Sequence, residues 1–555
     1  MFNFRRKRRM KKRLIYMVSV FLFTLFLLEL RVYYVQKKYS TSETGNFKGN
    51  HKQIEKISDL NYKLLDREGE DIFSFEDKYK VVIDSMAFRL NNIDQNLENI
   101  IAFNYIMQSE DKKFSFENII KSGGKLYFDV SKENFNKINS LNKIKGVYTY
   151  ETKERKKDDI WKIENMLSSS KGFALVEGED KRVKTLEIEK DENSLEGIIK
   201  KELDKNKDYE ISFERDNDGL YDEGIFKIPE ENLNVRLTLD KELQKIVREV
   251  LNKEEYKSFK NAGVLLIDSE TGEILSLAQK NEASPNVVLG SGSIKGYEAG
   301  SIFKILTLEA AMEKEGVGLL DELRCDGLVC KKEKIHGTIS IKEAFEVSCN
   351  DVFARLGAKV GTKNLLNFSK EQGVFSKVLN LDEKTGMETK GYVPQNVSIT
   401  NLSIGQSMQT TLMQMASIIG PIVNEGTYIK PYIVKNFENQ KGEVKKVFNE
   451  EKREVLSKKT ALALKEVMNS TVLDGTANIA KINGVEVGAK TGTAEAKGGE
   501  LHGWFLGYFK HEGKYYTLGV MVPNIKEVYE DRKPGGGNTA GPIFRDIVLE
   551  ITKNK

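Results

Sequence analysis

The most apolar stretch of the chain lies close to its start. "LIYMVSVFLFTLFLL", residues 14–28, holds no charged residue, and the apolar character continues to residue 35 with Glu29 and Arg31 as interruptions. A helix over 14–35 is long enough to cross a bilayer core of about 30 Å, because both long side chains can reach the headgroups. A cleaved secretory signal has a similar pattern, but no small-residue cleavage site follows here. We therefore predict an uncleaved, single-pass membrane anchor.

Three later stretches show the periodicity of regular secondary structure. "NVRLTLDKELQKIVREVLN", residues 234–252, alternates first and then repeats every three to four residues, which predicts a strand followed by a helix. "AGVLLIDSETGEILSLA", residues 262–278, predicts two apolar strands joined in a hairpin. "YKLLDREGEDI", residues 62–72, predicts strand, turn and strand.

Between residues 75 and 230 the apolar residues come in short runs such as "KYKVVID" and "FALVEG", in a background rich in Lys, Asn and Glu. This pattern predicts a small α+β region, and we find no catalytic constellation in it. "SEDKKFSFENI", residues 109–119, loosely resembles the acidic signature of peptidoglycan glycosyltransferases but lacks its following His and Gly. We interpret it as the start of a charged helix with Ser109 as the N-cap.

The positive charge of the chain is concentrated at its start. The first thirteen residues hold eight basic side chains and no acidic one, and subtracting them from the net charge of +4 leaves −4 for the rest. The body therefore gives no support for nucleic-acid binding. A basic segment before an apolar helix predicts a cytoplasmic N-terminus and an extracytoplasmic location for residues 37–555. Three cysteines are too few for a disulfide framework.

The first candidate for chemistry is "YEAGSIFKILTLEAAM", residues 297–312, a glycine-containing loop that continues as an apolar helix. Ser301 and Lys304 are three positions apart and so share one face of that helix. A serine hydroxyl becomes a nucleophile when a base takes its proton, and a lysine can be that base when burial or a nearby positive charge lowers its pKa. Taken alone, this spacing is common in a Lys-rich chain, where a capping serine followed by an exposed lysine is the default.

The second candidate is "EVSCND", residues 346–351, which lies ahead of a helix-like segment. The Ser348 hydroxyl can relay a proton, and the Asn350 amide can hold both an amine and a substrate carbonyl. A capping serine and a turn asparagine are the structural alternative.

The third candidate is "VGAKTGTAEAK", residues 487–497, which predicts a strand. Lys490 and Gly492 fall on one face of this strand, and Thr491 and Thr493 fall on the other. Gly492 lets a substrate or a neighbouring backbone approach closely, and the charge of Lys490 is expected to lower the pKa of Lys304. An edge strand protected by lysine is the structural alternative.

In this order, Ser-x-x-Lys at 301, Ser-x-Asn at 348 and Lys-Thr-Gly at 490 resemble the motif set of the penicilloyl serine transferases. Cys349 departs from the Asp of class A β-lactamases at the same place. "LTLDKELQ", "SIGQSMQTTLMQMA", "HGWFLGYF" and "GGGNTAGPIF" are similar to stretches that flank the site in class B penicillin-binding proteins, over roughly residues 235–550. This region therefore resembles that class, whereas residues 75–230 match it only in length and position.

The resemblance implies an α+β fold. The transpeptidase domain, residues 231–555, is expected to have a mostly antiparallel five-stranded sheet flanked by helices, plus a helical subdomain. An extended α+β pedestal of the dimerisation type is expected at 36–230, behind a transmembrane anchor at 14–35 and a cytoplasmic tail at 1–13.

The resemblance also implies a reaction. Ser301 is expected to be acylated by the penultimate D-Ala of a stem peptide that ends in D-Ala-D-Ala, and the amine of a neighbouring stem then attacks the acyl-enzyme. β-Lactams are expected to acylate the same serine because they mimic D-Ala-D-Ala. The other implied roles are general base for Lys304, proton-transfer and positioning partners for Ser348 and Asn350, carboxylate anchors for Lys490 and Thr491 beside Gly492, and oxyanion-hole N–H donors for Ser301 and Thr493.

We thus expect a membrane-bound peptidoglycan D,D-transpeptidase that requires no cofactor and works beside a separate glycosyltransferase. Two alternatives use the same fold. A β-lactam sensor needs cytoplasmic machinery, for which thirteen residues leave no room. A serine β-lactamase needs a deacylating carboxylate, and none is clear in the sequence.

One cluster is not explained by this reaction. "RCDGLVCKKEKIHGTIS", residues 324–340, brings Cys325, Cys330 and His336 within twelve residues. Three interpretations are open: a disulfide between the two cysteines, a structural zinc site with Asp326 or Asp321 as fourth ligand, and free thiols in a loop.

Overall fold

The computed structural model describes residues 17–19, 21–31, 51–57, 61–91, 93–156, 163, 167, 171–177, 183–290, 295–330, 335–384, 387–448, 450–496, 498–529 and 532–553. The chain divides into two compact units, one within Met1–Lys56, Lys78–Thr152 and Glu210–Lys227, and one within Ile57–Asp77, Lys153–Tyr209 and Ile228–Lys555. The predicted division between 36–230 and 231–555 differs from these units, because residues 57–77 and 153–209 belong to the larger one.

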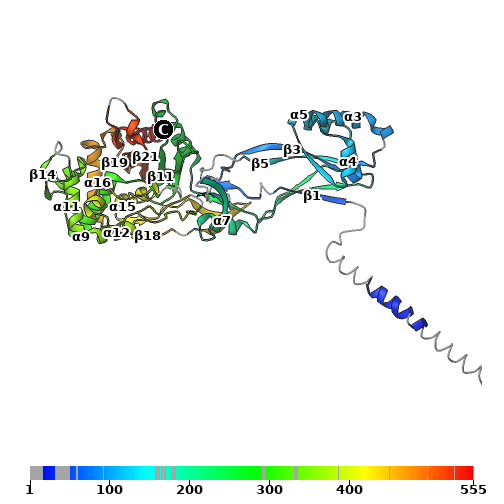
Figure 1. Cartoon of the computed structure of the whole chain (residues 1–555), viewed down its shortest axis with the longest axis horizontal. Helices are drawn as coiled ribbons and strands as arrows, with labels where there is room; N and C mark the ends of the chain where they lie inside the picture. The colour runs from blue at the N-terminus through cyan, green and yellow to red at the C-terminus, as the bar shows by residue number, and fades with distance from the viewer. Residues whose placement is uncertain are drawn as a thin grey trace, which may run out of the picture. The chain divides into compact units, whose positions relative to one another are not determined.

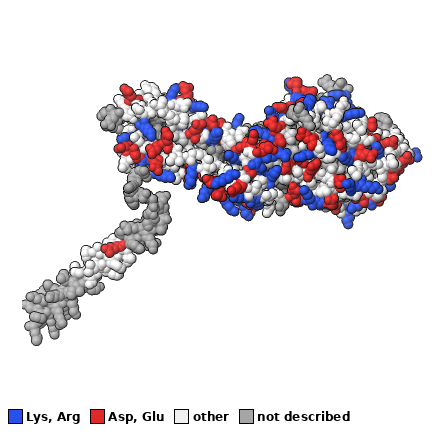
Figure 2. All heavy atoms as spheres, turned by 180° about the vertical axis from the view of Figure 1, so that it is seen from behind, with Lys and Arg blue, Asp and Glu red and all other residues white. Residues whose placement is uncertain are grey.

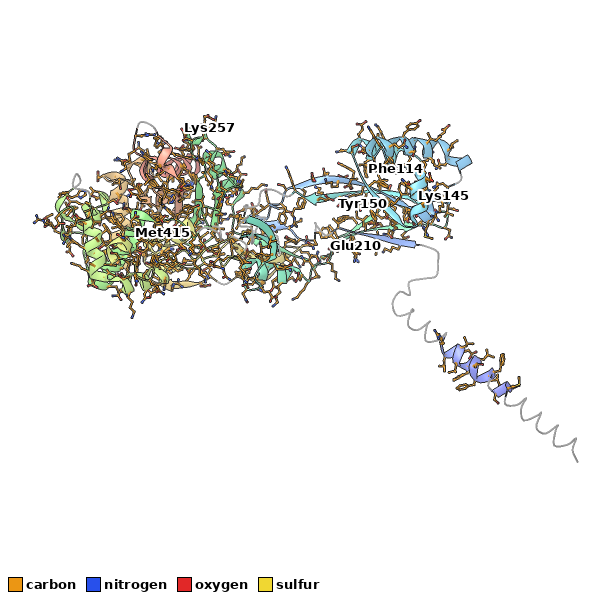
Figure 3. All side chains as sticks on the ribbon, viewed as in Figure 1. Phe114, Lys145, Tyr150, Glu210, Lys257 and Met415 are labelled. Atoms are coloured by element: carbon orange, nitrogen blue, oxygen red, sulfur yellow. The ribbon has the colours of Figure 1, made fainter. Side chains whose placement is uncertain are left out.

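The smaller unit has an α+β fold with the sheet orders β4-β3-β5 and β1-β8-β9 (Figure 1). Its helices bury an aromatic and aliphatic core that includes Val81, Phe103, Met107 and Phe114, the last of which is labelled in Figure 3. Its elements are β1 (His51–Ile57), β3 (Phe75–Asp84), α2 (Ser85–Phe88), α3 (Ile93–Glu110), α4 (Phe116–Ser122), β4 (Lys125–Val130), α5 (Lys132–Ser140), β5 (Val147–Arg155), β8 (Tyr209–Arg215) and β9 (Ile225–Lys227).

The prediction that Ser109 caps a helix start is wrong. Ser109 lies in the last turn of α3, and its hydroxyl donates to the carbonyl of Ile106. The cap of the next helix is Ser115, whose side chain accepts from the N–H of Asn118. The charged residues between Ser109 and Ser115 form the turn that joins the two helices. The first helix therefore follows the apolar periodicity of residues 93–107 and ends where the acidic residues begin.

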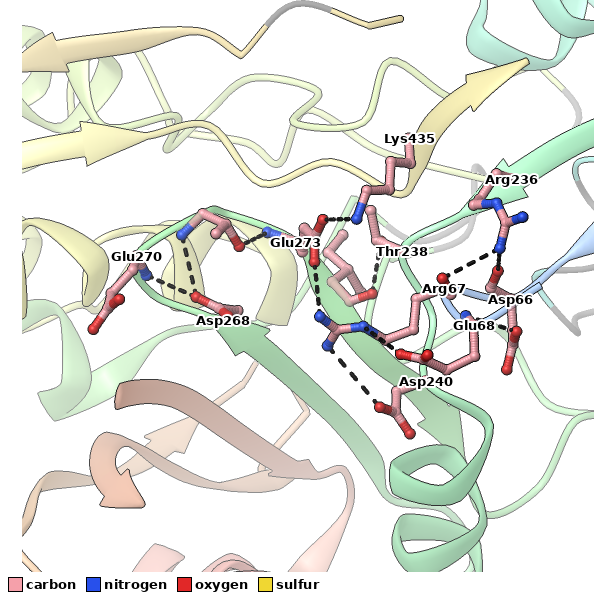
Figure 4. A network of polar contacts seen from close by, with 12 residues as sticks. Asp66, Arg67, Glu68, Arg236, Thr238, Asp240, Asp268, Glu270, Glu273 and Lys435 are labelled. Carbon is pink, nitrogen blue, oxygen red and sulfur yellow. Dashed lines mark hydrogen bonds and ion pairs between the residues drawn. The ribbon is translucent and has the colours of Figure 1, made fainter. Parts of the chain in front are cut away.

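The larger unit begins with the predicted strand, turn and strand at 62–72. The strand β2 (Leu64–Leu65) pairs in parallel with β10 (Leu233–Leu237), which pairs with β16 (Val434–Asn439). Figure 4 shows the polar contacts that fix the turn: Arg67 reaches Glu273 at 3.4 Å, and Lys435 reaches the same carboxylate at 2.8 Å. These contacts explain why this stretch packs with the larger unit.

The centre of the larger unit is a five-stranded antiparallel sheet of order β12-β11-β21-β20-β19, as predicted. The predicted hairpin at 262–278 supplies its first two strands, and β19 is its edge. The strands are β11 (Gly263–Asp268), β12 (Ile274–Gln279), β19 (Val487–Glu495), β20 (Leu501–His511) and β21 (Lys514–Val522).

Helices cover this sheet and build the predicted helical subdomain. In Figure 1, α9, α11 and α12 lie together on one side of the larger unit, and β11, β19 and β21 lie on the other. The helices are α7 (Leu195–Leu203), α8 (Lys241–Leu251), η2 (Glu254–Tyr256), η3 (Gly300–Phe303), α9 (Lys304–Glu315), α10 (Ile341–Glu346), α11 (Asn350–Val360), α12 (Thr362–Glu371), α13 (Ile399–Ser403), α14 (Leu412–Ser417), α15 (Gly420–Val423), α16 (Lys458–Leu473), η5 (Asn478–Ala480), η6 (Ile525–Glu527), η7 (Gly536–Asn538) and α17 (Ala540–Lys553). The short strands are β6 (Lys171–Glu177), β7 (Val183–Glu189), β13 (Glu322–Cys325), β14 (Gly337–Ser340), β15 (Thr427–Ile429), β17 (Val444–Val447) and β18 (Lys452–Glu454).

Near the start of the chain, residues 17–19 and 21–31 are helical, and their large apolar side chains, such as Phe21, Phe23 and Leu28, are exposed. Within the described residues, no helix combines the length and hydropathy that a membrane crossing requires. The predicted anchor, 14–35, reaches beyond this helix at both ends, and the predicted tail, 1–13, lies outside the described residues.

On the face seen in Figure 2, basic and acidic side chains are interspersed.

Candidate active site

Ser301 lies at the start of a buried helix, as its sequence context predicts. The chain forms one 3-10 turn, η3, and then continues without a break into α9, which begins at Lys304. The turn is held in place by Gly300, whose N–H donates to the carbonyl of Gly405 at 2.8 Å. Ser301 itself is partly exposed, whereas Ile302, Phe303 and Lys304 are buried. The hydroxyl therefore stands at the end of an apolar element and within reach of solvent.

Lys304 is fully buried and is bound by the second motif. Its Nζ donates to the carbonyl of Ser348 at 2.7 Å, to the Ser348 Oγ at 3.1 Å and to the Asn350 Oδ1 at 2.7 Å. Burial lowers the pKa of Lys304 to about 7, although the nearby Cys349 and Cys330 thiols act in the opposite direction. An unprotonated amine is therefore available near neutral pH.

Ser348 is the point where the three motifs meet. Its Oγ also accepts a hydrogen bond from the Nζ of Lys490 at 3.0 Å, so one hydroxyl lies between two buried amines. Its φ is +58°, in the left-handed region that a non-glycine residue adopts at a cost. Such strain is tolerated where surrounding contacts dictate the conformation, here the bonds to both lysines.

The second buried amine, Lys490, is affected in the same direction. Burial lowers the pKa of Lys490 well below its usual value, and the charge of Lys304 lowers it further. Burial is the main cause of the lowered pKa of Lys304, as the apolar helix around it in the sequence predicts.

The third motif lies on β19, directly against the Ser301 segment. At Gly492 an added Cβ would lie 3.1 Å from the carbonyl oxygen of Ala299, and at Gly300 an added Cβ would lie 2.9 Å from that of Thr493. Glycine at both positions lets the two backbones touch. On the opposite strand face from Lys490, the Thr491 hydroxyl donates to the Thr476 hydroxyl at 3.1 Å. Thr493 accepts from the N–H of Gly536 at 3.1 Å.

The third cysteine completes the unexplained cluster. The ligand atoms of Cys325, Cys330, His336 and Cys349 all lie within 4.8 Å of one another. Cys325, Cys330 and Cys349 form no disulfide, so the predicted alternative of a bridge between Cys325 and Cys330 is not realised. The expected fourth ligands point elsewhere: Asp326 pairs with Arg355 at 2.8 Å, and the Asp321 carboxylate accepts from the N–H of Gly318 at 2.9 Å.

Sequence reasoning missed two residues of this region. In the sequence, Cys349 is only a departure from a motif, and nothing there marks it as a partner of the other cysteines. Nothing in the sequence gives Asp351 a role either, although its buried carboxylate accepts from the N–H groups of Gly327 at 2.6 Å and Cys330 at 3.2 Å and so fastens the cysteine loop to α11. Only the proximity of both residues to Asn350 pointed to them.

A serine at a helix start, three positions before one of two buried amines that share a second hydroxyl, is typical of a serine-type acyltransferase site. The family model described as "Penicillin binding protein transpeptidase domain" matches residues 262–549, which span every motif of this site. The chain belongs to this family. The predicted class of enzyme and the predicted resemblance to class B penicillin-binding proteins are thereby confirmed.

The relatives agree with this assignment. "Stage V sporulation protein D" of Bacillus subtilis is 28% identical over 79% of this chain and 69% of its own length. "Peptidoglycan D,D-transpeptidase PbpA" of Mycobacterium tuberculosis is 25% identical over 57% of this chain and 72% of its own length. The crystal structure of a peptidoglycan synthetase from Bifidobacterium adolescentis, 18% identical, superposes with a TM-score of 0.61 over 91% of this chain and 97% of that one, which shows a shared fold.

Proposed function

We propose that this protein is a membrane-anchored peptidoglycan D,D-transpeptidase in which Ser301 forms the acyl-enzyme. The observation that carries the proposal is the pair of buried amines, Lys304 and Lys490, that converge on Ser348 beside the Ser301 segment. Neither amine is expected to keep a full positive charge at neutral pH, because burial disfavours it. A base of this kind is what a serine hydroxyl needs to become nucleophilic.

The proposed acylation uses these groups in order. The Lys304 amine takes the proton of Ser301 as its Oγ attacks the carbonyl of the penultimate D-Ala. Backbone N–H groups of Ser301 and Thr493 stabilise the developing oxyanion, and Lys490 and Thr491 hold the terminal carboxylate. The proton passes through Ser348 to the leaving amine, and the C–N bond breaks to release D-Ala.

The test of this proposal is labelling by a fluorescent penicillin. The full chain should form a covalent adduct that lasts for hours, and Ser301→Ala should abolish the adduct without changing the unfolding temperature. Thr307→Ala is a matched control, because this hydroxyl on α9 donates to the Ser403 carbonyl at 2.8 Å, away from both lysines. Labelling that persists in Ser301→Ala would place the nucleophile elsewhere, and an adduct lost within seconds would favour a β-lactamase.

The membrane anchor, residues 14–35, is part of the proposal, with the N-terminus cytoplasmic and the catalytic unit outside. The exposed apolar helix at 17–19 and 21–31 supports it, because such a surface is not stable in water without a partner. The labelled protein should remain with membranes after a carbonate wash, whereas a variant without residues 1–36 should be labelled in the soluble fraction. A glycosyltransferase on a separate chain would supply the glycan strands.

We also propose a structural zinc ion held by Cys325, Cys330, His336 and Cys349. The Sγ atoms of Cys330 and Cys349 are 3.8 Å apart, and the Sγ of Cys325 is 3.4 Å from the His336 Nδ1. In a tetrahedral site with Zn–S bonds of about 2.3 Å, neighbouring sulfurs are about 3.8 Å apart, so the donor set fits. Four protein ligands leave no open position, which makes the ion structural. It would fix Cys349 and with it the two partners of Lys304.

Metal analysis tests the zinc proposal. Protein purified without chelator should contain about one zinc per chain, and Cys349→Ser should lose most of it. Asp326→Asn should keep the metal, because Asp326 pairs with Arg355 instead. Thiol titration gives a second measurement: the cysteines should react slowly before chelation and quickly after it. A metal-free wild-type protein with three reactive thiols would leave the free-thiol interpretation.

A further inference from the structure

A cavity of about 480 Å³ lies next to Thr491 of the third motif. Thr476 and Gly537 line it, and both also touch β19. The Thr476 hydroxyl accepts from Thr491, and an added Cβ at Gly537 would lie 3.8 Å from the Thr491 Cγ2. The cavity therefore lies directly next to Thr491, one of the two residues proposed to hold the terminal carboxylate of the donor.

The wall of this cavity carries a guanidinium that is held in place. Arg532 lies over the ring of Tyr529 at 4.0 Å, and the Tyr529 hydroxyl donates to the Asn538 carbonyl at 2.6 Å. Arg545, also in the lining, is paired with Asp546 at 2.8 Å. Among the described residues, Arg532 makes no ion pair, and its side chain is exposed.

The proposed reaction indicates where the acceptor substrate would lie along β19 relative to this cavity. The scissile carbonyl would lie at the N–H of Thr493, and the terminal carboxylate would lie at Lys490 and Thr491. The leaving amine therefore lies between these positions. In the second half of the reaction the acceptor amine must occupy the place that the leaving amine has vacated. The reason is that the acceptor amine attacks the same carbonyl carbon from which the leaving amine departed, and from the same side. Whatever is attached to the acceptor amine extends past Thr491 toward Thr476.

We propose that this cavity is the acceptor subsite, and that Arg532 binds a carboxylate of the incoming stem peptide. The inference rests on the proposed function and adds the binding mode of its second substrate. The acceptor amine attacks the ester carbonyl, a C–N bond forms, and the bond to the Ser301 Oγ breaks. The proton lost by the amine returns to that oxygen through Lys304 and Ser348, which restores the free serine.

The test compares two acceptors on the same donor. A thioester analogue of acyl-D-Ala serves as donor, with either a synthetic stem tetrapeptide bearing a free side-chain amine or D-alanine as acceptor. Arg532→Gln should lower transfer to the tetrapeptide about fivefold to tenfold at low acceptor concentration, because a charge-assisted contact is lost. Transfer to D-alanine, donor hydrolysis and penicillin acylation should change less than about twofold, because D-alanine is too small to reach Arg532.

Two further variants make the result decisive. Lys533→Gln removes a neighbouring exposed cation that does not line the cavity and should leave both transfers unchanged. Asn478→Asp places a negative charge in the lining and should also weaken transfer to the tetrapeptide. Equal losses for both acceptors, or no loss in either cavity variant, would overturn the subsite. A wild-type protein that penicillin does not acylate would overturn the proposed function instead.

Discussion

The hydroxyl of Ser348 accepts hydrogen bonds from two lysine amines. Its Oγ lies 3.1 Å from the Nζ of Lys304 and 3.0 Å from that of Lys490, and its left-handed backbone turns the carbonyl toward Lys304 as well. Two ammonium groups at such a distance would repel each other in a dry site. The arrangement is therefore stable only when at least one amine is neutral, which is the state that general-base catalysis by Lys304 requires.

This leads to a prediction on pH. Lys304 is active as a base when it is unprotonated, and its pKa lies at about 7. The second-order rate constant for acylation by penicillin should therefore rise with pH, about tenfold per unit well below pH 7, and level off above it. Stopped-flow measurement of the fluorescent adduct gives the profile. A rate that is flat across pH 7 while the protein stays folded would contradict the role of Lys304.

Local periodicity predicted the elements that carry the site. The hairpin at 262–278, the helix after Ser301 and the two faces of β19 were all visible because they depend on neighbouring residues. The 3-10 turn at 300–303 was not, because it is imposed by the contact of Gly300 with Gly405. The place of Cys349 was likewise hidden, since it depends on the folding of the 325–336 loop onto α11.

Helix α9 also carries a buried acid. Burial raises the pKa of Glu309 from 4.5 to about 8, and Gln372 donates to its Oε2 at 2.8 Å while its Oε1 has no hydrogen-bond partner among the described residues. At pH values between 4.5 and about 8, the Glu309 carboxyl is protonated in the folded state and ionised in the unfolded state. The stability that this proton provides is complete below pH 4.5 and disappears as pH rises through about 8.

We therefore expect the unfolding temperature to fall between pH 6 and 8.5, roughly by a few degrees, and Glu309→Gln to flatten part of this fall. Only part is expected to vanish, because buried Glu388 has a pKa raised to about 7 and contributes in the same direction. Glu315→Gln, at the exposed end of the same helix, is the matched control and should keep the wild-type slope. An unchanged slope in Glu309→Gln would show that Glu309 is charged in the folded protein.

At the scale of the whole molecule, the sequence predicted the presence of a smaller and a larger unit better than it predicted which residues belong to each. The predicted boundary at 230 follows a change in composition, and composition carries no information about long-range pairing. The parallel pairing of Val235 with Leu64 and the contact of Arg67 with Glu273 join residues more than 160 positions apart. Such contacts place 57–77 in the larger unit, and the hydrogen bond from the Asp191 N–H to the Asp382 carboxylate does the same for 153–209.

The chain passes between the two units at 56–57, 77–78, 152–153, 209–210 and 227–228. A recombinant fragment trimmed to start at residue 231 would therefore be missing β2, and the side of β10 that β2 occupies would be left as a bare sheet edge. It would also remove Arg67, one of the two cations that pair with the Glu273 carboxylate. Solubility and crystallisation trials of the catalytic half are thus better served by keeping residues 61–77 attached through a short linker than by cutting where the composition changes.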